Sequence, residues 1–378
     1  MGKRPQLKNI RRLVIKVGTR VLTGEDNLIL RPRIDHLASQ VGQLMERGIT
    51  VVLVSSGAVG AGLGEMGLRS YPRLIPNRQA LASIGQVQLM KIWEHAFANY
   101  GKLVGQVLVT AGDFQNRKSY VNLQNTFESL FRLGVVPVVN ENDSVAVREL
   151  RYGDNDALSA QVAGIVDAPL LVVLTDTDGV YTANPRNDPE AKRISVVDYI
   201  TPELTRATKG KGSEVSIGGM RTKILAAGLV TQAGKYCAIA SGADCDLVSL
   251  LEGKDLGTLF LPRADGLKRR KHWIAFTSRS RGKLLVDEGA RSALTRKGSS
   301  LLSSGIREIV GRFETGDVVE IACGEEQPAF AKGVTSYSAE DLERIKGLHS
   351  SRIEEVLGHG GPGEVVHKDN LVLINTEQ

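Results

Sequence analysis

Between about residues 10 and 262, short apolar runs alternate with longer amphipathic stretches. Short apolar runs predict strands and stretches with a helical period predict helices, so the alternation predicts repeated β-α-β units and a mostly parallel sheet. The runs are continuously apolar, which indicates that helices cover both faces of the sheet. The expected fold class is therefore α/β, a three-layer sandwich with a mostly parallel central sheet. We expect strands over 13–17, 50–54, 102–108, 135–139, 170–174 and 236–240, and helices over 32–47, 77–100, 121–133 and 219–233.

A dense group of carboxylates and carboxamides follows the apolar run 135–139. Residues 140–143 read Asn-Glu-Asn-Asp, and residues 153–156 read Gly-Asp-Asn-Asp. Ligands of parallel sheets bind at the carboxyl ends of the strands, and buried polar groups there must be paired or bind a ligand. The segment therefore predicts a polar binding site. The alternative is that Asn155 or Asp156 only caps the helix that residues 157–166 predict.

Two other strand ends are suited to anions. Lys16 lies at the end of the first apolar run and is followed by Gly18, whose backbone a phosphate can approach closely, although a lone lysine is usually just solvated. The small residues 55–62 leave backbone N–H groups free to bind an anion. Residues 62–67 also match G-x-G-x-x-G, but no acidic residue ends a second strand about 20 positions later, so we discount a dinucleotide site.

A further pair of motifs points to phosphate. Thr-Asp-Thr-Asp-Gly at 175–179 follows an apolar run, and Gly-Gly-Met-Arg-Thr-Lys at 218–223 opens a helical stretch. Glycines at a helix start with a lysine one turn later hold a phosphate through backbone dipoles and a point charge, although glycine pairs are also common in simple turns. No GxxxxGK[ST] motif occurs, which excludes a P-loop enzyme. Lysines, carboxylates and glycine-rich strand ends together are typical of phosphoryl transfer.

A basic segment separates two differently patterned regions. Arg263–Lys283 holds eight Lys or Arg residues and one Asp, whereas the net charge of all 378 residues is only +6. We therefore expect one domain over 1–262, a basic linker over 263–280 and a second domain over 281–378. Short β-like pieces with turn residues between them predict a small β-rich barrel or sandwich there. The linker is either a solvated connector or an edge that contacts RNA phosphates.

Other features exclude several classes of protein. The cysteines form no CxxC pair and the histidines no HExxH motif, so neither a disulfide framework nor a zinc site is predicted. No apolar run approaches the roughly 18 to 20 residues of a membrane span, and the N-terminal residues lack the apolar core of a signal peptide. We therefore expect a cytoplasmic protein with no membrane association.

The motifs, taken in order, resemble the amino acid kinase family. IKVGTR, VLVSSGAVGAG, VVPVVNENDSVA, YGDNDALSA, LTDTDGVYTANPR and GGMRTK appear in the family's order across about residues 10–262. The NEND and GDND pair and the YTANPR run resemble the branch that phosphorylates glutamate, rather than those acting on carbamate, acetylglutamate, uridylate or isopentenyl phosphate. The tail, above all GKLLVDEGARSALTRKGSSLLSSGI, resembles a PUA domain, an RNA-associated module.

The resemblance implies an enzyme that uses ATP to phosphorylate the side-chain carboxylate of L-glutamate, the first step toward proline. That carboxylate is anionic at neutral pH, so no general base is needed. The catalytic positions implied are Lys16, Lys223 and Asp156, and the glutamate positions are Ser56, Asp143 and Asn155. Mg²⁺ is assigned to Asp154 and Asp156. The ATP positions are Lys16, Thr175, Asp176, Ile217, Gly218, Gly219, Met220, Arg221, Thr222 and Lys223, with Ile217 in place of the family's usual threonine.

The resemblance also implies partners. These are proline as a feedback inhibitor, glutamyl phosphate reductase downstream, further copies of the chain in a dimer or tetramer, and RNA bound through the PUA domain. Two alternative functions stay open at this point. One is a kinase of the same fold for another small acid, and the other is an RNA-binding protein whose kinase half is regulatory.

Overall fold

The computed structural model describes residues 4–24, 28–68, 70–146, 155–185, 187–201, 204, 219–263, 271, 274, 280–358 and 362–374. The chain divides into two compact units, one formed by Met1–Phe114 with Lys118–Gly266 and the other by Gln115–Arg117 with Leu267–Gln378. Each unit has its own sheet and its own apolar core. Among the described residues, no helix combines the length and apolar content needed to cross a membrane.

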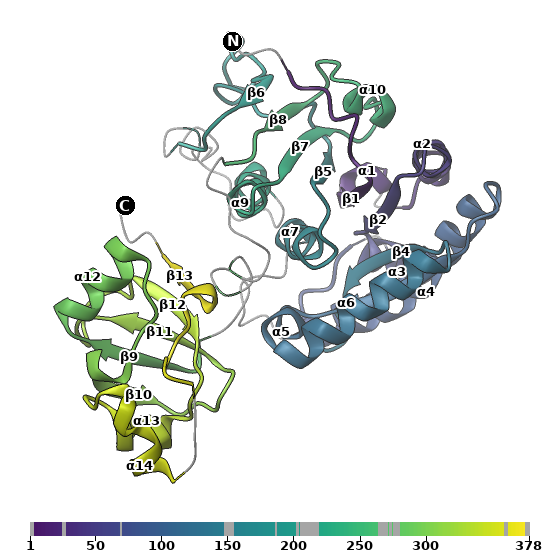
Figure 1. Ribbon diagram of the computed structural model, residues 1–378. Helices are drawn as coiled ribbons and strands as arrows, with labels where there is room; N and C mark the ends of the chain where they lie inside the picture. The colour runs from purple at the N-terminus through teal and green to yellow at the C-terminus, as the bar shows by residue number, and fades with distance from the viewer. Residues whose placement is uncertain are drawn as a thin grey trace. The chain divides into compact units, whose positions relative to one another are not determined.

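An eight-stranded sheet with the order β3-β4-β2-β1-β5-β7-β8-β6 forms the centre of the first unit (Figure 1). Every pairing in it is parallel except that of β7 with β8, which confirms the mostly parallel sheet expected from the sequence. The strands are β1 (Arg12–Val17), β2 (Thr50–Val54), β3 (Val104–Val109), β4 (Val136–Glu141), β5 (Leu170–Thr175), β6 (Val196–Val197), β7 (Tyr236–Ser241) and β8 (Thr258–Phe260).

Helices cover both faces of this sheet. Successive residues of β1 enter different cores, because side chains alternate along a strand: Leu13 and Ile15 lie in one, and Val14 lies in the other. The first core is completed by α2, α4 and α10, and the second by α6, α7 and α9 (Figure 1). The three-layer arrangement is therefore confirmed. The helices are α1 (Thr19–Leu22), α2 (Arg31–Glu46), α3 (Ala58–Glu65), α4 (Ile75–Ala98), α5 (Ala111–Gln115), α6 (Arg117–Arg132), α7 (Asn155–Ile165), α9 (Met220–Gln232) and α10 (Leu247–Leu251).

The expected elements are present with small shifts at their ends, the largest at α6, which begins at Arg117 rather than at residue 121. The main difference concerns the glycine-rich residues 55–62. They form a short loop and then helix α3, which begins at Ala58 behind Gly57, whose φ of 97° lies in the left-handed region. The anion-binding loop is therefore shorter than expected.

The glycines of this region serve helix packing. A Cβ atom at Gly62 would lie 2.0 Å from the carbonyl oxygen of Leu81, and one at Gly85 would lie 1.8 Å from that of Ala58. Only glycine therefore lets α3 and α4 cross at this distance. The G-x-G-x-x-G match lies within α3 and the turn behind it rather than between a strand and a helix, which agrees with discounting a dinucleotide site.

The second unit has a five-stranded sheet with the order β10-β9-β11-β12-β13 and a core that includes Leu284, Val319 and Ile321. The sequence did not predict β10 or the three α-helices, because β10 is mostly exposed and the helices are short and polar. The elements are β9 (Gly282–Val286), α12 (Glu288–Lys297), β10 (Ile306–Gly311), β11 (Val318–Ala322), β12 (Ala331–Val334), α13 (Ala339–Ile345), α14 (Ile353–Leu357) and β13 (Leu371–Leu373), with 3-10 turns at Ser303–Gly305, Ser350–Arg352 and Lys368–Asn370.

Candidate active site

The expected site residues gather at one edge of the first sheet. Lys16 lies in β1, Ser56 follows β2, Asp143 follows β4, and Thr175 ends β5. These strands are parallel neighbours, so their carboxyl ends lie at the same edge, which is where ligands of such sheets bind.

A buried cluster of two lysines and one carboxylate forms the centre of this edge. The Nζ atom of Lys16 lies 2.5 Å from Oδ1 of Asp156, and Nζ of Lys223 lies 3.1 Å from Oδ2. The hydroxyl of Thr222 donates a hydrogen bond of 2.7 Å to the same Oδ2 atom. Asp156 is 0% exposed, and both lysines are also buried. The fold therefore joins β1, α7 and α9 through one carboxylate.

The two lysines keep the carboxylate of this cluster ionised. Burial by itself raises the pKa of Asp156, but the ammonium groups of Lys16 and Lys223 and the hydrogen bond from Thr222 outweigh burial and hold that pKa below its usual range. Asp156 is therefore ionised at neutral pH, and among these three side chains two ammonium groups face one carboxylate. Ammonium groups at this edge of the sheet are suited to bind an anionic ligand.

Asn155, the neighbour of Asp156, joins a second network. Its Nδ2 atom lies 3.0 Å from the carbonyl oxygen of Ser55, 3.0 Å from the hydroxyl of Ser56 and 3.1 Å from Oδ1 of Asn140. The side chains of Asn155 and Asp156 therefore point to the strand ends and to the lysines. The alternative that they only cap α7 is wrong, because their polar atoms are engaged elsewhere.

Three residues of these networks were not singled out from the sequence. Asn140 is 2% exposed and donates a hydrogen bond of 2.8 Å to Oε1 of Gln86 in α4. Trp93, also in α4, donates a hydrogen bond of 3.1 Å to the hydroxyl of Ser55. Asn140 belongs to the Asn-Glu-Asn-Asp run, which was a usable signal. Gln86 and Trp93 lie in an ordinary amphipathic helix, and nothing in the local pattern marks them.

Asp143 lies in the turn behind β4, and this turn contacts α4. The hydroxyls of Ser83 and Ser144 are 2.7 Å apart, and the side-chain amide of Gln79 donates to the carbonyl oxygen of Ala146. Burial raises the pKa of Asp143. An ionised Asp143 would therefore be stabilised by a cationic ligand.

Thr175 and Asp176, two of the expected ATP positions, lie at the end of β5. The hydroxyl of Thr175 donates to Oδ1 of Asp176, and Arg20 donates to Oδ2, both at 3.0 Å. Burial raises the pKa of Asp176, but these bonds outweigh burial and lower it. Arg20 belongs to the KVGTR motif and adds a further cation near this strand end.

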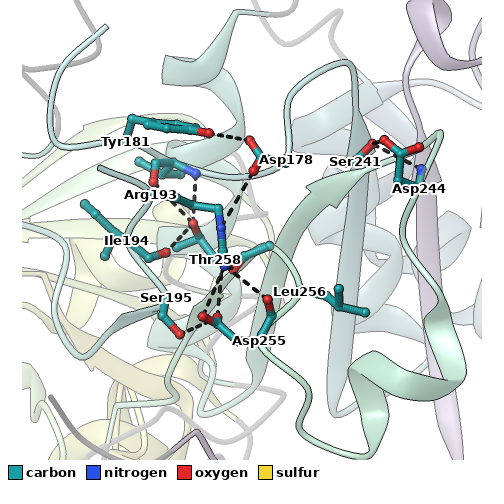
Figure 2. Close-up of polar contacts among 12 residues, drawn as sticks. Asp178, Tyr181, Arg193, Ile194, Ser195, Ser241, Asp244, Asp255, Leu256 and Thr258 are labelled. Atoms are coloured by element: carbon teal, nitrogen blue, oxygen red, sulfur yellow. Dashed lines mark hydrogen bonds and ion pairs between the residues drawn. The ribbon is translucent and has the colours of Figure 1, made fainter. Parts of the chain in front are cut away.

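A polar network stabilises the segment behind Asp178 (Figure 2). Arg193 pairs with Asp255 at 3.1 Å and with Asp178 at 3.7 Å, and Asp178 accepts a hydrogen bond of 2.8 Å from the hydroxyl of Tyr181. Thr258 of β8 accepts from the N–H of Val180 at 2.8 Å. The segment that follows β5 is therefore held against β8 and the loop before it.

The remaining expected positions fall on α9 or outside the described residues. Gly219 is the N-cap residue of α9, Met220 is partly buried, and Arg221 is exposed. Asp154, Ile217 and Gly218 lie outside the described residues, so their assigned roles stay predictions.

The described residues offer little to a metal ion. They contain no group of three or more His, Cys, Asp or Glu side chains placed to hold one. Both carboxylate oxygens of Asp156 already contact cationic or hydroxyl groups of the protein. The arrangement therefore fits orientation of the lysines by Asp156 better than metal ligation, and it fits Mg²⁺ only as a companion of nucleotide phosphates, which supply most of its ligands.

Comparison with known proteins identifies the family. Residues 11–241 match the model of the amino acid kinase family, which is more than half of the chain. The chain belongs to the amino acid kinase family. Residues 282–357 match the model of the PUA domain. The exact domain limits 1–262, 263–280 and 281–378 stay predictions, and most of the expected linker lies outside the described residues.

Within the amino acid kinase family, the chain is similar over nearly its whole length to proteins named glutamate 5-kinase. It is 48% identical to that of Syntrophotalea carbinolica over 368 residues, which are 97% of this chain and 98% of the relative. It is 46% identical to that of Citrifermentans bemidjiense, covering 97% and 99% of the two chains. It is 42% identical to that of Pelobacter propionicus, covering 98% and 100%.

Proposed function

We propose that this chain is an ATP-dependent kinase that phosphorylates the side-chain carboxylate of L-glutamate, giving glutamyl 5-phosphate and ADP. The observation that carries the proposal is the buried cluster of Lys16, Asp156 and Lys223 beside the amide network of Asn155. The cluster is suited to the charge of a phosphate, and the amide network is suited to a small polar substrate. The similarity to relatives named glutamate 5-kinase over nearly the whole chain supports the same substrate.

In the proposed reaction an oxygen of the glutamate side chain attacks the γ-phosphorus of ATP, and the bond from that phosphorus to the bridging oxygen breaks. The attacking carboxylate is already ionised, so no proton moves. Lys16 and Lys223 stabilise the negative charge of the transferring phosphoryl group, and Asp156 holds both ammonium groups in place. Catalysis then rests on alignment and charge rather than on a general base.

Recognition of glutamate is assigned to Ser56, Asp143 and Asn155. A carboxylate whose pKa burial has raised gains from a cation, and the α-ammonium group of glutamate supplies one. The hydroxyl of Ser56 and the backbone N–H groups that open α3 are suited to a carboxylate. This assignment predicts that glutamate with an acylated amino group does not bind.

ATP is assigned to Lys16, Thr175, Asp176 and the start of α9, where Gly219 precedes a helix whose first turn carries Lys223. A helix start and a nearby lysine together bind phosphate well. Mg²⁺ bound with ATP would neutralise phosphate charge, with Asp154 as the assigned contact of the protein, because both oxygens of Asp156 already contact the lysines and Thr222.

The remaining partners rest on the sequence resemblance. They are feedback inhibition by proline, transfer of the product to glutamyl phosphate reductase, assembly into a dimer or tetramer, and contact of the PUA domain with RNA. The expected cytoplasmic location rests instead on the cysteine pattern and the apolar runs of the sequence.

The proposal is tested by ATP-dependent hydroxamate formation, in which hydroxylamine traps the acyl phosphate. We expect product with glutamate, little with aspartate, whose side chain is shorter, and none with acetylglutamate, which lacks the α-ammonium group. Loss of a charged partner of a buried group typically costs about 2 to 5 kcal/mol, enough to make this difference clear. Equal rates with glutamate and acetylglutamate would contradict the assignment.

A further inference from the structure

Three side-chain amides form a chain beneath the expected glutamate site. Gln86 of α4 accepts from Nδ2 of Asn140 in β4 at 2.8 Å, and Oδ1 of Asn140 accepts from Nδ2 of Asn155 in α7 at 3.1 Å. Gln86 and Asn140 are 8% and 2% exposed. These three amides thus connect α4, which carries no assigned site residue, with α7, which carries two.

Two backbone groups determine the direction of this chain. The N–H of Glu141 donates to Oδ1 of Asn140 at 2.9 Å, so the Nδ2 atom of Asn140 faces Gln86, which must present its oxygen. At the other end, Nδ2 of Asn155 faces the carbonyl oxygen of Ser55. The Oδ1 atom of Asn155 therefore points away from the chain, and it is buried without a hydrogen-bond partner among the described residues.

Helix α4 is well suited to hold the end of such a chain. Gly85, the neighbour of Gln86, lies against the backbone of α3, where even a methyl group would not fit. Trp93, two turns farther along the same face, donates to the hydroxyl of Ser55 and so supports the other strand end. The helix therefore positions both ends of the Asn155 network.

We infer that Gln86 is a positioning residue for the amino-acid substrate. By holding Asn140, and through it Asn155, it keeps Oδ1 of Asn155 turned toward the site as an acceptor for the α-ammonium group. A bare buried acceptor is unfavourable, and an N–H donor of the substrate satisfies it. The inference rests on the proposed glutamate kinase function but concerns a residue that this function did not require.

The test compares three variants of the full-length protein. Gln86→Met removes the acceptor with little change in volume, so Asn140 and Asn155 lose their fixed orientation. Gln86→Glu keeps an oxygen acceptor for Asn140 and replaces the Nε2 amide group with a second carboxyl oxygen. Gln88→Met is the matched control, because Gln88 is the same residue type in the same helix but lies about 200° around it.

We expect Gln86→Met to raise the KM for glutamate about tenfold or more, while the KM for ATP changes less than about twofold. Gln86→Glu should recover most of the glutamate affinity, and Gln88→Met should match the unchanged protein. Glutamate should also raise the melting temperature of the unchanged protein more than that of Gln86→Met. Should Gln86→Met not fold, Gln86→Asn, whose amide is too short to reach Asn140, takes its place.

An unchanged KM for glutamate in the Met or Asn variant would overturn the inference. So would equal losses of glutamate affinity in Gln86→Met and Gln86→Glu, because an oxygen acceptor for Asn140 would then not restore binding, and so would a parallel rise in both KM values. Failure of the proposed function is distinguishable, since the unchanged protein would then form no glutamyl hydroxamate.

Discussion

At the scale of single residues, Asp156 shows how one side chain organises a site. It is fully buried, yet it stays ionised because the two ammonium groups and one hydroxyl around it outweigh the effect of burial on its pKa. Its neighbour Asn155 reaches the ends of β2 and β4. Two adjacent positions therefore connect the phosphate side and the substrate side of the proposed site.

Changing Lys16 or Lys223 to Ala should lower kcat by about 100-fold or more, because each removes a charge that stabilises the transferring phosphoryl group. Steady-state kinetics with glutamate and ATP measure the effect, and circular dichroism verifies folding. A smaller loss for Lys223 would mean that it contributes more to nucleotide binding than to the transition state. A loss explained by unfolding alone would make the cluster structural.

Asp143→Asn should separate binding from stability. Because burial raises the folded pKa of Asp143, its ionisation disfavours folding; this cost is absent well below the unfolded value of 3.8 and is complete above the raised folded pKa. At neutral pH the variant should therefore unfold at the same or a higher temperature, yet lose stabilisation by glutamate.

The same argument predicts that, in the unchanged protein, the KM for glutamate rises as the pH falls through the raised pKa of Asp143. Kinetics from neutral pH downward toward the unfolded value of 3.8 measure this rise. A flat pH profile together with normal glutamate binding by Asp143→Asn would show that the carboxylate does not contact the ammonium group.

At the scale of elements, the crossing of α3 and α4 determines how the residues of the site are positioned. α3 begins directly behind Ser56, and α4 carries Gln86 and Trp93, so the distance between these helices sets how the ends of β2 and β4 are held. Gly62 and Gly85 provide that distance by leaving no side chain at the contact.

Gly85→Ala should destabilise the protein by about 2 kcal/mol or more, because the added methyl group would overlap the carbonyl oxygen of Ala58. Gly228→Ala in α9 is the matched control. Its Cβ atom would lie 3.6 Å from Cδ1 of Ile200, an ordinary contact, so a gain of about 0.5 to 1 kcal/mol is expected. Urea unfolding of both variants measures the difference, and similar values would show that α3 and α4 adjust easily.

At the scale of the whole molecule, the two units bury separate cores. Among the described residues, the buried members of the two cores of the first sheet end at Phe260, with Leu261 packed against one of them, and the third core begins at Leu284. The described site residues all belong to the first unit. The residues that match the PUA domain therefore contribute no assigned catalytic group.

A protein that ends at Pro262 should fold and keep glutamate kinase activity, whereas its response to proline or its oligomeric state should be the property that changes. Calorimetry and the hydroxamate assay measure the first two properties. If the truncated protein folds and binds ATP but has no glutamate kinase activity, part of the active site lies in the second unit. If the basic segment contacts RNA, the affinity of the separated second unit for RNA should fall steeply as the salt concentration rises.

Local sequence patterns were sufficient to predict much of this protein. The continuous apolar runs predicted β1, β2 and β5 within one residue at their ends, because a strand that is buried on both faces is apolar at nearly every position. The order of polar motifs behind these runs predicted which strand ends carry chemistry. The resemblance to the amino acid kinase family added the individual residues.

Only the tertiary structure decided how these residues act together. The side chain of Asn155 points away from α7 because it binds Ser55 and Ser56, which lie 100 and 99 positions earlier in the sequence. The direction of the amide chain depends on the backbone of Glu141, and the role of Gly85 depends on Ala58. Local periodicity reports whether a residue is buried, but hydrogen-bond partners are chosen by the packing of distant elements, and no local pattern contains that choice.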